Sequence, residues 1–350
     1  MRIAQVSPLH EAVPPKLYGG TERVVSYLTE ELVALGHDVT LFASGDSITS
    51  ARLVCTCERA LRLASSCHDR CLYHLMQIDA VLNRQQDFDI IHFHADYRHY
   101  PFIKRIATPT LTTLHGRLDL PDYPSFYRTF KDLPFASISD TQRRPLPFLN
   151  WRGTVHNGLP ERRFARGSGD GGYLAFLGRI SPEKGVDRAI AIARRVGLPL
   201  RVAAKVDDAD RAYFSSIRPL FDHPMVEFLG EIGEAEKGDF LGDALALLFP
   251  IDWPEPFGLV MIEAMACGTP VLAFRHGAVS EVIEDGVSGC VVDSLDQAVA
   301  AVDRILALDR RRCRANFEEH FSSVRMANRY LDLYRQLSPM AAETSLAPVD

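Results

Sequence analysis

Short apolar runs alternate with amphipathic stretches in the first part of the chain. Residues 2–7 form an apolar run of the kind that is typical of a buried strand in a parallel sheet. After a loop that closes at Gly19 and Gly20, apolar side chains recur at helical spacing over 24–35. Residues 37–43 then form the next predicted strand. The order of strand, glycine-rich loop, helix and strand predicts the start of a Rossmann-type domain, although the Gly-x-Gly-x-x-Gly dinucleotide fingerprint is absent.

Further apolar runs in this half predict strands at 89–94, 110–115, 135–139 and 153–157, and the stretch 53–86 is expected to be helical. Polar residues stand at or just after the ends of three of these strands, namely His94, Asp96, His115 and Ser139. Ligands of open parallel sheets bind at the carboxyl ends of strands. Each of these residues could instead be a structural polar group, and we favour a functional role only for His115, which precedes Gly116 in a strand-end turn.

The pattern is interrupted at 158–172, which is rich in glycine, arginine and charge and is predicted to be a linker. A second series then begins, with strands expected at 173–177, 200–205, 226–229, 244–250 and 270–273, and helices at 186–195, 209–220, 239–242, 298–308 and 323–337. The α/β pattern therefore predicts two Rossmann-like domains, 1–160 and 161–322. The final helix, 323–338, is predicted to follow them, and 339–350 is expected to be a disordered tail.

Composition narrows the class of protein. The 350 residues are 47% hydrophobic and 24% charged, with a net charge of −6, so nucleic acid is not an expected partner. The sequence has no apolar segment long enough to span a bilayer and no signal peptide, which leads us to expect a cytoplasmic protein. Seven cysteines suggest reduced thiols. Four of them, with two histidines, could form a zinc site, but their spacing contains no compact Cys-x-x-Cys pair, and no metal site is predicted.

The most informative stretch is 252–270. Prolines flank Glu255, so its loop should be stiff, and helical spacing begins at Leu259. Phe257 and Gly258 would then lie at a helix N-terminus, where unpaired backbone N–H groups attract phosphate. Glu263 falls within the same helix, and a carboxylate can accept hydrogen bonds from neighbouring hydroxyls. The stretch therefore indicates a site for a ligand with both phosphate and sugar hydroxyls. The alternative is an ordinary core helix after a proline loop.

A second candidate site follows the strand at 173–177. Arg179 and Lys184, with a glycine beside each, could form an anion pocket without a P-loop consensus. The alternative is a surface loop in which Glu183 pairs with Lys184. The anion pocket is favoured because both cations are expected at the same edge of the second sheet as Glu255.

Together these motifs resemble the family-4 glycosyltransferases. The resemblance rests on Gly-Arg-Ile-Ser-Pro-Glu-Lys-Gly at 178–185, on Glu255 and Glu263 separated by seven residues, and on Gly19-Gly20. It covers nearly the whole chain and implies the GT-B architecture of two facing Rossmann-like domains, with the final helix crossing back to the first domain. It also implies a metal-independent, retaining enzyme that moves a sugar from a UDP- or GDP-sugar and uses no cofactor. The acceptor, whether a small molecule, a lipid-linked sugar or a glycan, is not indicated, and peripheral membrane contact stays open.

The resemblance also implies roles for individual residues. Arg179 and Lys184 would bind the diphosphate, Glu255 the transferred sugar and Glu263 the ribose. His115 would touch the donor sugar, and the remaining donor-binding residues would be Gly19, Gly20, Gly230, Ile232, Phe257, Gly258 and Leu259. On the acceptor side, which the N-terminal domain would build, the candidates are His94, Asp96 and Ser139. One departure from the pattern is the end of the strand at 200–205, which reads Ala-Ala-Lys where many relatives have Ala-Gly, so Ala204 would leave less room near the donor.

Other functions remain open on the same residues. A nucleotide-sugar epimerase or a phosphorylase can share the fold, because fold does not fix function. A pyridoxal-binding lysine, which a phosphorylase needs, cannot be identified. An NAD-dependent oxidoreductase is disfavoured by the missing fingerprint, and a non-catalytic sugar-binding protein is disfavoured by the intact charged motifs.

Overall fold

The computed structural model describes residues 1–16, 19–62, 64, 67–95 and 97–338. The expected tail at 339–350 and the candidate Asp96 lie outside the described residues. The chain divides into two compact units, the first made of residues 1–158 and those from 323 on, the second of residues 159–322. The chain thus enters the second unit at Leu159, two residues before the predicted boundary, and returns to the first unit at Ser323.

In the described part of the first unit, seven parallel strands form one sheet in the order β3-β2-β1-β4-β5-β6-β7. The strands are β1 (Arg2–Val6), β2 (Asp38–Ala43), β3 (Arg52–Cys55), β4 (Ile90–Phe93), β5 (Thr110–Leu114), β6 (Phe135–Ser137) and β7 (Trp151–Thr154). Its helices are α1 (Gly20–Ala34), α2 (Arg70–Asn83), α3 (Tyr100–Ile103), α4 (Tyr123–Thr129) and α13 (Ser323–Leu337). The last helix packs beside α1, and the Ser323 hydroxyl donates to Glu31 at 2.8 Å.

The prediction of a helix over 53–86 is wrong for its first part. Residues Arg52–Cys55 form the edge strand β3, in which Leu53 and Val54 align with Leu41 and Phe42 of β2. The helix α2 starts only at Arg70, where the Asp69 carboxylate accepts a hydrogen bond from the Cys71 amide at 2.9 Å. Strand pairing, which a local pattern does not reveal, determines the conformation here.

The described second unit contains a six-stranded parallel sheet in the order β10-β9-β8-β11-β12-β13. Its strands are β8 (Leu174–Arg179), β9 (Leu200–Lys205), β10 (Val226–Gly230), β11 (Ala246–Phe249), β12 (Val271–Phe274) and β13 (Gly289–Val292). Its helices are α5 (Val186–Val196), α6 (Arg211–Ile217), α7 (Lys237–Gly242), α8 (Leu259–Ala266), α9 (Val279–Val282), α10 (Leu295–Ala300), α11 (Val302–Leu306) and α12 (Arg310–His320). Two parallel-sheet units confirm the predicted fold class.

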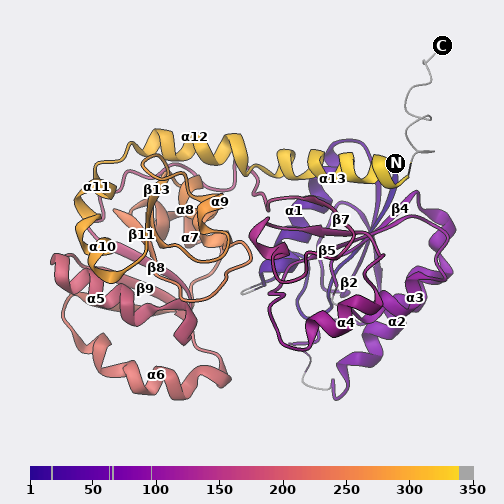
Figure 1. The fold of residues 1–350 in the computed structure, drawn as a ribbon, viewed down its shortest axis with the longest axis horizontal. Coiled ribbons are helices and arrows are strands. Elements are labelled where there is room, and N and C mark those ends of the chain that lie inside the picture. Colours follow the sequence, from indigo (N-terminus) through magenta and orange to yellow (C-terminus); the bar gives the residue numbers. More distant parts are fainter. Residues whose placement is uncertain (17–18, 63, 65–66, 96, 339–350) are drawn as a thin grey trace, which may run out of the picture. The chain divides into compact units, whose positions relative to one another are not determined.

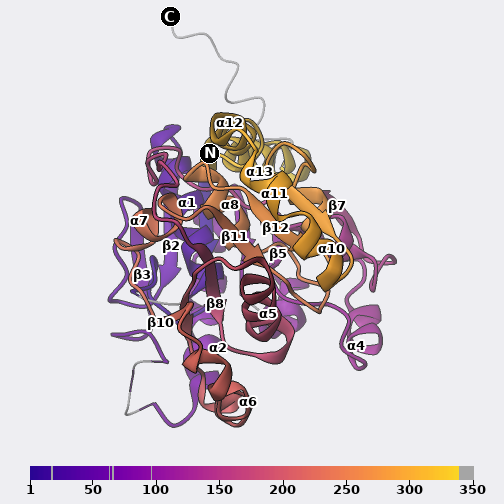
Figure 2. The same ribbon diagram turned by 90° about the vertical axis from the view of Figure 1, so that its left-hand side faces the viewer.

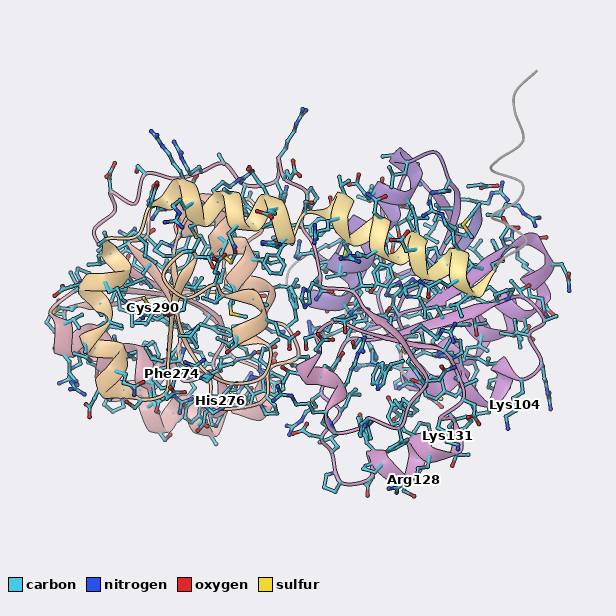
Figure 3. The ribbon with its side chains drawn as sticks, turned by 45° about the horizontal axis from the view of Figure 1, so that its top comes forward. Lys104, Arg128, Lys131, Phe274, His276 and Cys290 are labelled. Carbon is cyan, nitrogen blue, oxygen red and sulfur yellow. The ribbon has the colours of Figure 1, made fainter. Side chains whose placement is uncertain are left out.

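Helices cover the second sheet and bury a continuous apolar core. Helix α5 lies beside α10, and α12 packs on α8 (Figures 1 and 2). Phe274 and Cys290, both labelled in Figure 3, belong to this core. Burial of such side chains stabilises the fold by roughly 25 cal/mol per Å² of apolar surface.

One sequence interpretation in this unit needs correction. The segment expected to be a linker is packed within the second unit: the amides of Gly167 and Gly169 donate to the carbonyls of Cys267 and Gly242. A Cβ at Gly167 would stand 2.1 Å from the Gly242 oxygen, so glycine serves close packing here, not flexibility. Arg310, the first residue of α12, is half-buried and donates to the backbone carbonyls of Gly242 and Ala244.

No helix among the described residues combines the length with the apolar character that crossing a bilayer would require. Within the same residues, His, Cys, Asp and Glu side chains form no group of three or more that could hold a metal ion.

Candidate active site

The proline-flanked stretch leads from β11 into α8 as the sequence predicts. Gly258 takes the left-handed conformation (φ 84°) as the N-terminal cap, and α8 begins at Leu259. Phe257 is buried. The Glu255 carbonyl accepts a hydrogen bond from the Ala278 amide at 2.9 Å, which fixes this loop to the segment after β12. Its backbone is therefore held in place by the flanking prolines and by the segment between β12 and α9.

The Glu255 side chain is almost fully buried and has two polar partners. Its Oε2 atom forms an ion pair with Lys184 Nζ and accepts a hydrogen bond from Trp253 Nε1 at 3.1 Å. Lys184 Nζ also lies 4.8 Å from the centre of the Trp253 ring. The two motifs that the sequence singled out separately therefore meet in one place. The Glu183 carbonyl accepts from the Asp252 amide at 2.8 Å, which ties the two loops together.

Arg179, the last residue of β8, lies among three carboxylates. Glu183 is 2.7 Å away, and Asp210 and Asp207 are at 3.5 and 3.7 Å. Glu183 thus pairs with Arg179, not with Lys184 as the surface-loop alternative required. Asp207 also contacts Lys205 at 2.9 Å, so the last residue of β9 adds a cation beside Arg179. Sequence reasoning missed Asp207 and Asp210, although the acidic run 207–210 follows directly on a strand end.

Glu263 is buried in the middle of α8 and is held by a lysine that the sequence analysis did not identify. Lys237 Nζ, at the start of α7, lies 2.9 Å from Glu263 and 3.2 Å from Glu234. Glu234 follows the segment 230–232, which begins at Gly230, the last residue of β10. Through Lys237, the segment that follows β10 is linked to the carboxylate of α8.

In the first unit, the strand ends bring together two of the predicted residues. The His94 Nδ1 atom lies 2.9 Å from His115 Nε2, and burial lowers the pKa of His115 to about 4. Ser139 is fully buried, and its hydroxyl accepts a hydrogen bond from the Gln142 amide, as a turn cap would. That role is sufficient to explain its burial.

Gly20 begins α1, and Gly19 packs against Pro15, to which a Cβ would come within 2.8 Å. Glu22, in the first turn of α1, is buried. Burial is the main cause that raises the pKa of Glu22 to about 7. Its carboxylate accepts from the Glu11 amide at 3.3 Å. Sequence reasoning missed this acidic residue beside the glycine pair.

Gly277 holds the Glu255 loop in place and gives a direct test of it. It follows His276, labelled in Figure 3, and has φ 56°; a Cβ there would stand 2.2 and 2.3 Å from the Glu255 carbonyl oxygen and amide nitrogen. We expect Gly277→Ala to displace the loop, to lower the melting temperature and to reduce kcat/KM. Left-handed strain alone costs about 1–3 kcal/mol.

The control is Gly286→Ala, because Gly286 also has positive φ but no atom within 4 Å of an added Cβ. Calorimetric melting and kinetics of the two variants separate backbone strain from displacement of Glu255. Equal losses in both would show that the Glu255 loop does not depend on Gly277.

Comparison with known proteins gives two family matches. Residues 160–320 match the family described as Glycosyl transferases group 1, and residues 18–168 match Glycosyltransferase Family 4. A D-inositol 3-phosphate glycosyltransferase of Mycobacterium marinum is 35% identical over 147 residues, which is 38% of this chain and 30% of the relative. The chain thus matches about a third of the length of this relative and of its counterparts in Mycobacterium ulcerans and Salinispora arenicola.

A phosphatidyl-myo-inositol mannosyltransferase of Mycobacterium leprae is 27% identical over 342 residues and matches along most of both chains, 89% of this one and 88% of the relative. Among solved structures, AviGT4, a glycosyltransferase of avilamycin A biosynthesis, has a TM-score of 0.75 at 24% identity, covering 97% and 98% of the two chains. HepE of Anabaena in complex with UDP has a TM-score of 0.71 at 16% identity, covering 96% and 100%. These structures share the GT-B fold. The two family matches, which together extend from residue 18 to residue 320, and the motifs assembled around Glu255 show that this chain belongs to the family-4 glycosyltransferases.

Proposed function

We propose that the protein transfers a sugar from a UDP- or GDP-sugar to an acceptor hydroxyl with retention of the anomeric configuration. The observation that carries the proposal is the convergence of Lys184, Glu255 and the N-terminus of α8 in the second unit. One cation, one carboxylate and a set of unpaired backbone N–H groups are what a sugar joined to a diphosphate requires.

The chemistry follows from the charges. When the bond between sugar and diphosphate breaks, negative charge grows on the diphosphate and the sugar becomes cation-like. Arg179 and Lys184 would stabilise the leaving diphosphate, and the amides at the start of α8 would add to this effect. Glu255 would orient the sugar through its hydroxyls. In this structure Arg179 and Lys184 are paired with carboxylates. We propose that the diphosphate replaces these carboxylates as the partner of the two cations, and that Glu255 then binds the hydroxyls of the sugar.

The relatives support a nucleotide-sugar donor. HepE has been solved with UDP and with UDP-glucose, and the M. leprae relative is named a mannosyltransferase. We propose the same class of donor and a hexosyl transfer for this chain, with Glu263 and the segment 230–232 at the nucleoside. We also propose a cytoplasmic location, because all seven cysteines are free thiols, as expected in a reducing compartment.

We expect turnover to persist in excess EDTA. Arg179 and Lys184 can balance the charge of the diphosphate, which is the role that Mg²⁺ or Mn²⁺ plays in metal-dependent transferases. The measurement is release of nucleoside diphosphate with and without chelator. Complete loss of turnover in EDTA that Mg²⁺ or Mn²⁺ restores would contradict metal-independent transfer.

The proposed function itself is tested by incubating the protein with a panel of UDP- and GDP-sugars. Phosphorus NMR should detect slow release of UDP or GDP from the preferred donor, and proton NMR should show that the freed sugar first appears in the donor's anomeric configuration. Release of the opposite anomer would overturn retention. Binding of every donor without any release, even with added acceptor alcohols, would favour a non-catalytic binding protein.

A further inference from the structure

A buried chain of hydrogen bonds in the first unit connects the C-terminal helix α13 with His115. Its members are Gln5 of β1, His92 and His94 at β4, Thr113 and His115 at β5, and Tyr330 and Tyr334 of α13. All except His115 are at most 3% exposed. A buried polar side chain that loses its partner costs free energy, so a network of this extent restricts every member.

One branch runs from Tyr334 to His115. Gln5 Nε2 donates to the Tyr334 hydroxyl at 2.9 Å, and Gln5 Oε1 lies 2.7 Å from His94 Nε2. His94 Nδ1 in turn lies 2.9 Å from His115 Nε2. The Tyr334 hydroxyl is thus linked to His115 through two side chains, Gln5 and His94.

The other branch leaves Tyr334 in the opposite direction. Its hydroxyl lies 2.7 Å from His92 Nδ1, and His92 Nε2 lies 2.7 Å from the Thr113 hydroxyl, which donates to Tyr330 at 3.1 Å. Tyr334 therefore joins two branches, whereas Tyr330 stands at the far end of one.

The chain of hydrogen bonds fixes which nitrogen of His115 carries its proton. Burial lowers the pKa of His92 and His94 well below the ordinary value and that of His115 to about 4, so the rings are neutral at neutral pH. A neutral imidazole donates from one nitrogen and accepts at the other. Because the Gln5 oxygen only accepts, His94 Nε2 must donate to it. His94 Nδ1 then accepts, so His115 Nε2 must donate, and His115 Nδ1 is an acceptor.

The direction of the whole branch depends on the orientation of the Gln5 amide. If the amide turned over, every donor and acceptor along the branch would exchange, and His115 would carry its proton on Nδ1. Tyr334 has a single hydroxyl proton. If Tyr334 donates that proton to Gln5, it can no longer donate to His92, so His92 and Thr113 must exchange their donor and acceptor roles as well. In the wild-type protein, turning the Gln5 amide over therefore requires the hydrogen bonds of the other branch to reverse their direction as well.

We propose that Tyr334 and Gln5 are positioning residues that set the tautomer and ring orientation of His115. Without the Tyr334 hydroxyl, the Gln5 amide can turn over while the hydrogen bonds of the second branch keep their direction. The effect on turnover rests on the proposed function, in which His115 touches the donor sugar. The tautomer itself does not depend on that function.

The test is long-range ¹H–¹⁵N NMR of the full chain, which distinguishes protonated from unprotonated imidazole nitrogens, with His115→Gln used to assign the signals. In the wild type we expect His115 as the Nε2–H tautomer. In Tyr334→Phe we expect the Nδ1–H population to rise about fivefold or more, the size of effect that loss of one hydrogen bond produces. We also expect kcat to fall while KM for the donor changes little.

Tyr173→Phe is the matched control, because Tyr173 is also buried and likewise loses its hydroxyl, which donates to the Phe240 carbonyl in the second unit and has no part in this network. It should leave the His115 spectrum unchanged. If Tyr334→Phe does not fold, Gln5→Met interrupts the same branch and should give the same mixture. An unchanged His115 tautomer in the folded Tyr334→Phe or Gln5→Met variant, or an equal change in Tyr173→Phe, would overturn the proposal. If no variant or wild type turns over any donor but the tautomer still changes, the proposed function is wrong and this inference stands.

Discussion

Replacing Arg179 by alanine should weaken binding of UDP or GDP and reduce turnover by a similar factor. Arg179 sits at the end of β8 with its side chain one-third exposed, so the loss belongs at the lower end of the ~2–5 kcal/mol that breaking a charge pair costs. About 2 kcal/mol corresponds to roughly a thirtyfold loss of affinity. The alanine variant also leaves Glu183, Asp207 and Asp210 without their shared cation, which adds repulsion toward an anionic ligand.

Calorimetric titration with UDP and GDP, beside kinetics with the full donor, measures both effects. The control is Arg195→Ala, because Arg195 pairs with Asp296 on the exposed side of α5 and its removal should change neither quantity.

Lys184→Ala should resemble Arg179→Ala but should also disturb binding of the sugar, since it removes the partner of Glu255. Nucleotide affinity at the wild-type level in Arg179→Ala would show that the diphosphate binds elsewhere.

Glu255→Gln should lower kcat/KM about a hundredfold and leave affinity for the free nucleoside diphosphate nearly unchanged. The change keeps the shape of the side chain but removes the charge that orients the sugar. A loss of roughly 3 kcal/mol of transition-state stabilisation gives that factor, at ~1.4 kcal/mol per factor of ten. Kinetics with the full donor and titration with the bare nucleotide separate the two effects.

Glu263→Gln is the informative comparison, because Glu263 is a buried carboxylate on the same segment. It should weaken nucleotide binding through the ribose, an effect that Glu255→Gln lacks. If Glu255→Gln loses nucleotide affinity as severely as Arg179→Ala, then Glu255 does not lie at the sugar end of the donor.

Much of the fold could be predicted because local pattern and final structure agree. The bounds predicted for the last helix coincide with α13, and α8 begins at Leu259, directly after the proline-flanked loop. Where the pattern was misleading, non-local contacts decide the conformation. Strand β3 exists because it pairs with β2. The glycine-rich segment is packed within the second unit because Gly167, which has no Cβ, can lie directly against the backbone of Gly242.

The same distinction holds for the candidate site. Arg179, Lys184 and Glu255 are visible from sequence because each lies at a strand end or between a strand end and the start of the next helix, and Glu263 because it lies inside the helix that follows the proline-flanked loop. Their partners are not, because Lys237 and Asp207 come from other elements and no spacing rule connects them. The polar chain behind His115 was hidden for the same reason: it joins Gln5 to Tyr334, which are 329 residues apart.

The proposed donor site is tested most directly by a crystal structure of the full chain with the nucleoside diphosphate that it binds best. We expect the diphosphate within hydrogen-bond distance of Arg179 and Lys184 near the start of α8, with the ribose hydroxyls on Glu263. A diphosphate bound away from these residues, or a folded protein that binds neither UDP nor GDP, would contradict it.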